Sequence, residues 1–197
     1  MPTKLFSVLV LTVSLISCSL NKTNNNHFEV KTNVIEPSKM RFAGKGAGAG
    51  MMLMSSMGPM GIAIGVAIDE GIANDIDKTA KMSGFDIETS VLQTLSSTLK
   101  AKAQKSAFKA QSVNEITIEI SRYGFVIQPG GDDLVTAQLH LNVTLNGKKW
   151  LNINYPEQLT EQQRKDIKTE TLELVKSDGQ VIEELFVKAL KNIDKIL

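Results

Sequence analysis

The chain has 197 residues, of which 42% are hydrophobic and 22% charged, with 22 basic against 21 acidic side chains. This length is sufficient for one domain with a hydrophobic core, and the balanced charge argues against a nucleic-acid partner. The single cysteine excludes an internal disulfide.

The first 18 residues have the pattern of an export signal that ends at the cysteine. Lys4 precedes an apolar run from Leu5 to Ile16, and Ser17 and Cys18 follow it. A basic start, an apolar stretch of about 7–15 residues and a small residue before the cleavage point are typical of a secretory signal peptide.

Residues Leu15-Ile16-Ser17-Cys18 resemble the lipobox of bacterial lipoproteins. This resemblance implies that residues 1–17 are a signal peptide and that Cys18 carries covalent lipid, namely diacylglycerol and a fatty acyl chain such as palmitate. Ser19 follows the cysteine where an Asp would favour retention in the inner membrane. The resemblance therefore implies a lipid anchor in the outer membrane, with the protein facing the periplasm, and we predict no other cofactor.

Two short segments separate this anchor from the rest of the chain. Residues 18–27 are mostly polar and predict a flexible tether. Residues 28–43 place Phe28, Val30 and Val34 in a rough alternation, which predicts a strand or a linker.

Residues 44–82 form a segment that is rich in Gly, Ala and Met. The stretch from Ala47 to Ile68 contains 22 residues without a charge. As one helix it would be about 33 Å long, close to the thickness of the hydrocarbon layer of a bilayer. Pro59 lies in the middle of this stretch, so the alternative is two shorter helices that form a re-entrant hairpin.

Small residues recur at four-residue steps in this segment, which brings them onto one helix face and allows close helix packing. Two interpretations remain open: contact with or insertion into a membrane, and a tightly packed element inside the fold or at an oligomer interface. Both predict a homo-oligomer or an envelope protein as partner. The predicted packing residues are Gly44, Gly46, Gly48, Gly50, Gly61 and Gly65.

Met51, Met54, Met57 and Met60 follow one another at three-residue steps. Thioether side chains bind Cu(I), so this row is a candidate copper site. Methionine is more often a pliable apolar filler, and successive three-residue steps turn by about 60° around a helix. We therefore predict no metal site and keep Cu(I) binding as the alternative.

Residues 84–197 have the pattern of an α+β domain. Asp86 is a good N-cap for an amphipathic helix that extends to about Lys109. Strict alternation then predicts a strand at 115–121 and another at 135–145. Asn146-Gly147 predicts a tight hairpin to a third strand at 148–155.

Two helices are predicted after this hairpin. Thr160 and Gln163 form a capping box that opens a helix to about Lys176, and a second helix follows Gly179. The fold class is therefore α+β. We expect a three- or four-stranded antiparallel meander covered on one face by amphipathic helices, with the Gly/Met-rich helical segment before it.

The sequence contains no recognisable catalytic motif and only two histidines, His27 and His140. In layout the chain resembles small envelope lipoproteins of Gram-negative bacteria, including the lipopolysaccharide-assembly and ABC-transport auxiliary lipoproteins. The Gly/Ala-rich segment is similar to that of the surface-exclusion lipoproteins of conjugative plasmids. These resemblances imply a non-enzymatic, lipid-anchored scaffold, oligomeric assembly or auxiliary subunit of an envelope machine. The alternative is a periplasmic ligand carrier or Cu(I)-binding lipoprotein.

Overall fold

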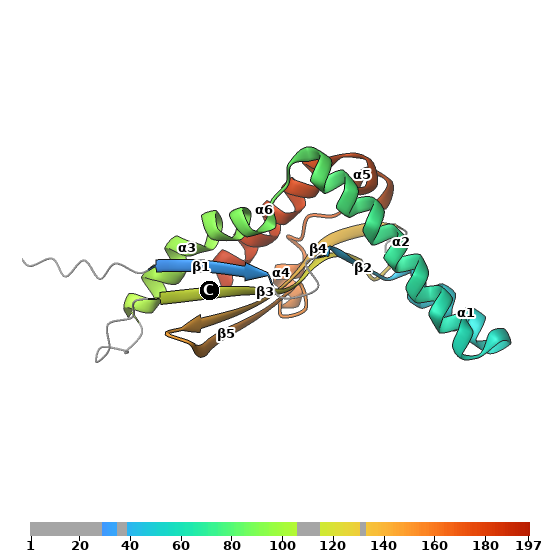
Figure 1. The fold of residues 1–197 in the computed structure, drawn as a ribbon, viewed down its shortest axis with the longest axis horizontal. Coiled ribbons are helices and arrows are strands. Elements are labelled where there is room, and N and C mark those ends of the chain that lie inside the picture. Colours follow the sequence, from blue (N-terminus) through green and yellow to red (C-terminus); the bar gives the residue numbers. More distant parts are fainter. Residues whose placement is uncertain (1–28, 35–38, 106–114, 131–132) are drawn as a thin grey trace, which may run out of the picture.

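The structure, a computed structural model, describes residues 29–34, 39–105, 115–130 and 133–197. A sheet lies on one side, helices cover one of its faces, and a helical hairpin projects beyond one end of the sheet (Figure 1). The predicted α+β class is confirmed.

The predicted meander forms the centre of the sheet. Strands β3 (Glu115–Ile127), β4 (Leu134–Leu145) and β5 (Lys148–Tyr155) pair antiparallel in that order. Asn146 and Gly147 connect β4 to β5 with φ values of 49° and 74°, as a tight hairpin turn requires.

The sheet is mixed, so the prediction of a purely antiparallel meander with three or four strands was wrong. β1 (Glu29–Val34) and β2 (Arg41–Ala43) both pair parallel with β3, one after the other along the same edge. On the other side of the sheet, the short strand β6 (Glu170–Thr171) pairs antiparallel with β4. A parallel pair needs a long crossover, and the helices between β2 and β3 supply it.

Gly124 allows β2 to dock against β3. Its φ is 152°, in a region that favours glycine, and a Cβ atom built there would lie 1.8 Å from the backbone oxygen of Arg41. Only a residue without a side chain permits this approach. Since β2 leads directly into the hairpin, this contact also fixes where the hairpin leaves the sheet.

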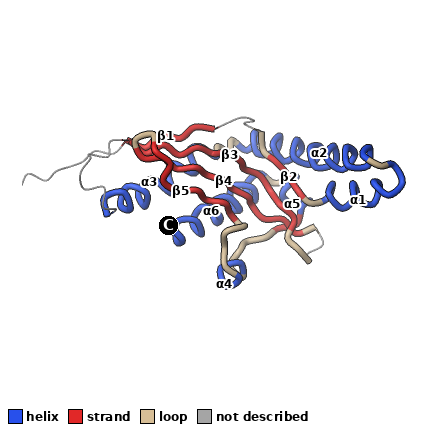
Figure 2. The backbone as a smooth tube through the Cα atoms, turned by 90° about the horizontal axis from the view of Figure 1, so that it is seen from below, coloured by secondary structure: helices blue, strands red, loops and turns tan. Residues whose placement is uncertain are grey.

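Helices α3 (Ile87–Lys105) and α6 (Gly179–Ile196) cover one face of the sheet, together with the second half of α2 (Pro59–Ser83). The view from below shows the sheet in front of these helices and its opposite face open (Figure 2). Asp178 caps α6 by accepting a hydrogen bond from the Gln180 N–H at 2.8 Å.

The helix predicted from Thr160 to about Lys176 is replaced by three short elements. The capping box forms, since the Thr160 N–H donates to Gln163 Oε1 at 2.9 Å, but α4 (Glu161–Arg164) is only one turn long. β6 follows, and α5 (Leu172–Ser177) comes after it. The helix ends early because residues 170–171 pair with the start of β4, and this long-range pairing outweighs the local preference.

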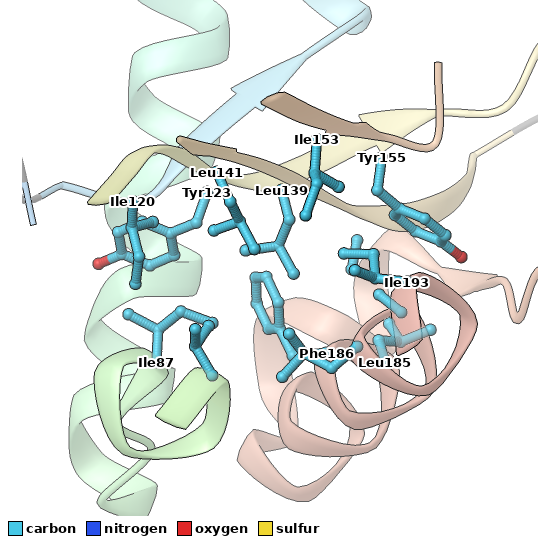
Figure 3. Close-up of a cluster of buried hydrophobic side chains, with 14 of the residues drawn as sticks. Ile87, Ile120, Tyr123, Leu139, Leu141, Ile153, Tyr155, Leu185, Phe186 and Ile193 are labelled. Carbon is cyan, nitrogen blue, oxygen red and sulfur yellow. The ribbon is translucent and has the colours of Figure 1, made fainter. Parts of the chain in front are cut away.

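Phe186 on α6 forms the centre of the hydrophobic core (Figure 3). Its ring lies 5.1 Å from that of Phe85, 5.2 Å from that of Phe125 and 6.2 Å from that of Tyr123, measured between centroids. Such aromatic contacts add to the free energy of burial. Side chains therefore fill the space between sheet and helices, and this packing fixes α6 on the sheet.

Candidate functional site: an apolar helical hairpin

Helices α1 (Lys45–Met57) and α2 form an antiparallel hairpin with Gly58 between them. The Gly58 N–H donates to the Met54 oxygen and the Gly58 oxygen accepts from the Gly61 N–H, both at 2.9 Å. Pro59, which has no N–H, begins α2. The predicted helix break at Pro59 is confirmed. We call residues 45–68, which project from the end of the sheet in Figures 1 and 2, the arm.

The two helices of the arm touch through glycine. Gly46, Gly50, Gly61 and Gly65 are buried in the contact. A Cβ atom at Gly46 would lie 1.8 Å from the Gly65 oxygen, and one at Gly61 would lie 2.5 Å from the carbonyl carbon of Leu53. The backbones therefore meet directly, as small residues at four-residue spacing allow.

The other two predicted packing glycines lie elsewhere. Gly44 is the N-cap of α1, with φ at 137°, and faces Ile127 of β3. Gly48 is exposed and has no neighbour within 4 Å of a built Cβ. Within one chain Gly48 therefore makes no contact with α2, because it lies on the opposite side of α1 from Gly46 and Gly50. Packing of Gly48 at an oligomer interface stays a prediction.

Asp69 closes the base of the arm. Its carboxylate accepts hydrogen bonds from the Gly46 N–H at 2.6 Å and the Gly44 N–H at 3.2 Å. Helix α1 has no capping side chain at its N-cap, so a carboxylate from α2 satisfies two of its free donors and stabilises the positive end of its dipole. Lys45 adds an ion pair with Asp133 at 2.7 Å.

The outer surface of the arm is apolar and uncharged. No charged residue lies between Gly46 and Ile68. Seven large hydrophobic side chains in this stretch are 45% or more exposed, and an exposed surface of this kind is typical of an interaction site. These residues are Met51, Met52, Met54, Met57, Met60, Ile62 and Val66.

The methionine row divides between the two helices of the arm. Met51, Met54 and Met57 lie on α1, and Met60 lies on α2. All four are exposed. Within the described ranges, no three His, Cys, Asp or Glu side chains gather in a way that could hold a metal ion. Cu(I) binding by the methionines stays a prediction.

A groove of about 460 Å³ lies at the base of the arm, between α2, β2 and the sheet. The groove is lined by three basic residues, Lys39, Arg41 and Arg122, and by two acidic residues, Asp69 and Glu70. The carboxylate of Asp69 already accepts the two N–H groups of α1. Sequence reasoning missed this groove, because its basic residues are distant from α2 in the chain.

The open face of the sheet carries a polar network. Asn152 donates to Asn142 Oδ1 at 2.7 Å, and Asn142 donates to Glu119 Oε2 at 3.2 Å. Next to it, Glu157 accepts from Gln138 and lies 3.3 Å from His140 Nε2. Burial raises the pKa of Glu157, but hydrogen bonds from Gln138 and His140 outweigh it and hold this pKa below its ordinary value.

The predicted signal peptide, tether and lipidation site at Cys18 lie outside the described residues. Of the helices in the described part of the chain, none combines the length and the apolar character that crossing a membrane requires. A scan against protein-family models, a search of curated proteins and a search of solved structures each find no match to this chain.

Proposed function

We propose that the protein is a non-enzymatic, lipid-anchored envelope protein that acts as a scaffold, with the arm as its point of attachment. The observation that carries this proposal is the projecting hairpin, because seven exposed apolar side chains on an uncharged surface serve contact rather than chemistry. The core between sheet and helices is packed with side chains such as Phe186 and Leu139, which favours a scaffold over a carrier of an apolar ligand.

The lipid anchor in this proposal comes from the lipobox-like residues 15–18. In this proposal the anchor holds the protein at the outer membrane. Further copies of the chain or another envelope protein would be the partner.

The mass of the N-terminal peptide from the membrane-extracted protein tests the anchor. We expect cleavage before Cys18 and the added mass of diacylglycerol and fatty acid, and no such mass in a Cys18→Ala variant. Sedimentation of the detergent-solubilised protein then tests the assembly. After the mass of bound detergent is subtracted, we expect a protein mass of at least twice that of one mature chain, residues 18–197. An unmodified Cys18 that still follows residues 1–17 would overturn the proposal.

A further inference from the structure

We infer that the arm inserts into one leaflet of a lipid bilayer. This inference deepens the function proposed above and rests on it, because it names the surface to which the arm attaches. Three features of the arm favour lipid over a second copy of the chain: the position of its charges, the distribution of its apolar side chains and its length.

The charges end at one level on both helices. On α1 the last charge before the uncharged stretch is Lys45, and on α2 the first charge after it is Asp69. Asp69 lies beside the start of α1, since its Oδ1 accepts from the Gly46 N–H at 2.6 Å. The border between charged and uncharged residues is therefore a plane across the whole arm. A bilayer surface imposes such a plane, whereas a protein partner needs an uncharged surface only where it makes contact.

The exposed apolar side chains surround the arm. Successive residues of a helix turn by about 100°, so Met51, Met52 and Met54 leave α1 in three directions. Ile62 and Val66 extend the apolar surface over α2. A helical element that is hydrophobic on all sides is typical of burial inside a protein or a membrane, and lipid chains contact every side at once.

The length of the arm matches one leaflet. The twelve uncharged residues of α1 from Gly46 to Met57 and the ten of α2 from Pro59 to Ile68 span about 18 and 15 Å at helical rise. Half of a hydrocarbon layer of about 30 Å is about 15 Å.

Both serine hydroxyls near the tip, and the backbone groups of Gly58, are paired within the arm. Ser55 Oγ donates to the Met52 oxygen at 2.7 Å, and Ser56 Oγ donates to the Leu53 oxygen at 3.2 Å. The N–H and oxygen of Gly58 are also used, and Pro59 has no N–H. Because hydrocarbon cannot accept or donate hydrogen bonds, this internal pairing lowers the cost of insertion.

The groove at the base of the arm fits the headgroup layer. Lys39, Arg41 and Arg122 line it at the level of Asp69, where the uncharged stretch ends. With Asp69 occupied by the N–H groups of α1, Glu70 is the remaining carboxylate of the lining. Basic side chains at this level attract the phosphates of anionic lipids.

The experiment uses a Cys18→Ala variant that is exported behind a conventional cleavable signal peptide, so that no acyl chain contributes and the chain has no cysteine. Single cysteines at Met52, Met57 or Met82 then carry the dye NBD, whose emission shifts to the blue in an apolar environment. Met82 is the matched control, because it is a methionine of α2 outside the arm and is 80% exposed, against 79% for Met52. The probe is a vesicle of phosphatidylcholine and phosphatidylglycerol.

We expect vesicles to shift the emission of dyes at positions 52 and 57 but not at position 82. Lipids that carry bromine deep in the leaflet should quench a dye at position 57, near the tip of the arm, more strongly than a dye on Ala47→Cys, near its base. Met52→Asp should weaken vesicle binding about tenfold or more, and Met82→Asp should leave it unchanged. Equal quenching of the dyes at positions 47 and 57, or no emission shift at positions 52 and 57, would overturn the inference.

Self-association through the arm, in place of insertion into lipid, is a separate outcome that also overturns the inference. In that case dyes at positions 52 and 57 would shift without vesicles, in proportion to protein concentration. The test is independent of the anchor: an unmodified Cys18 would refute the lipid-anchored function and leave a vesicle-dependent shift standing. Acylated Cys18 without any such shift would refute insertion of the arm alone.

Discussion

The Asp69 carboxylate lies 2.6 Å from the Gly46 nitrogen, 23 positions away in the chain, and this contact connects the two helices of the arm at their base. Glycine at positions 44 and 46 gives α1 a backbone that can pack closely but no side chain to cap its first turn. A residue of the neighbouring helix supplies the cap instead. The same residue marks the end of the uncharged stretch, so one side chain both closes the hairpin and sets the border of its apolar surface.

Asp69→Ala should lower the stability of the arm by about 1–2 kcal/mol, because it leaves two N–H groups at a helix start without their acceptor. Hydrogen exchange of the amides in residues 45–57 measures this directly. Glu70→Ala is the control, since Glu70 is the exposed neighbour of Asp69 and, among the described residues, Asp69 is the one whose carboxylate accepts from the Gly44 and Gly46 N–H groups. Asp69→Asn should fall between the two, because the amide keeps one oxygen acceptor and loses the charge. Equal exchange in the Asp69 and Glu70 variants would contradict the capping role.

Gly65→Ala should separate the helices of the arm, whereas Gly48→Ala should leave them in place. A Cβ at Gly65 would lie 2.3 Å from the Gly46 oxygen, and this neighbour is backbone that cannot rotate away. A Cβ at Gly48 meets nothing within 4 Å, so the change should stabilise α1 by up to about 1 kcal/mol through helix propensity. The distance between spin labels at Ala47 and Ala67 is the readout. A longer distance in both variants, or in neither, would refute this packing.

The sequence was sufficient to predict the elements whose signals are local. Alternation of Ile116, Ile118 and Ile120 predicted a strand, and Asn146-Gly147 predicted the turn that forms. Pro59 predicted the break of the arm into two helices for the same reason, since a proline acts on its own helix.

Features that depend on distant parts of the chain were not predictable. The parallel docking of β2 needs Gly124 to meet Arg41 across 83 positions, and no local pattern reveals that pair. Two pairs of glycines at the start of α1 and its N-cap have the same four-residue spacing, 44 with 48 and 46 with 50. Only the position of α2 decides that the second pair is buried. Asp69 was visible as the end of the uncharged stretch, but its partners on α1 depend on the antiparallel pairing.

Acid should remove the contribution of Asp86 to stability. Asp86 lies directly before α3 and accepts from the Thr89 hydroxyl, from the Thr89 N–H at 3.2 Å and from the Glu88 N–H at 3.2 Å. The Thr89 hydroxyl, followed by these backbone donors, outweighs desolvation and holds the pKa of Asp86 below its ordinary value. Because the folded pKa is lower than the unfolded one, the stabilisation is complete above the unfolded pKa of about 3.9 and disappears as the pH falls through the folded pKa.

The difference in unfolding free energy between the wild type and Asp86→Ala measures this effect. We expect a constant difference of about 1 kcal/mol in urea titrations from neutral pH down to about pH 5, and a steady decrease below about pH 4. Thr89→Val removes the hydroxyl and should weaken the pH dependence of the difference. A difference that stays the same down to the acid limit would show that Asp86 acts through its shape and not its charge.

Replacing the basic residues of the groove should weaken binding to anionic vesicles selectively. Each basic side chain near an anionic surface contributes about 1 kcal/mol, so Lys39→Gln combined with Arg41→Gln should reduce affinity for vesicles with phosphatidylglycerol about thirtyfold. Binding to pure phosphatidylcholine depends on the apolar tip and should change little. The same double variant should also bind anionic vesicles with a weaker dependence on salt, because screening acts on the interaction that was removed.

Lys188→Gln with Lys191→Gln on α6 is the matched control, since it removes two charges at a distance from the groove. An equal loss in both double variants would mean that the total charge of the protein, rather than the groove beside the arm, recruits it to anionic lipid.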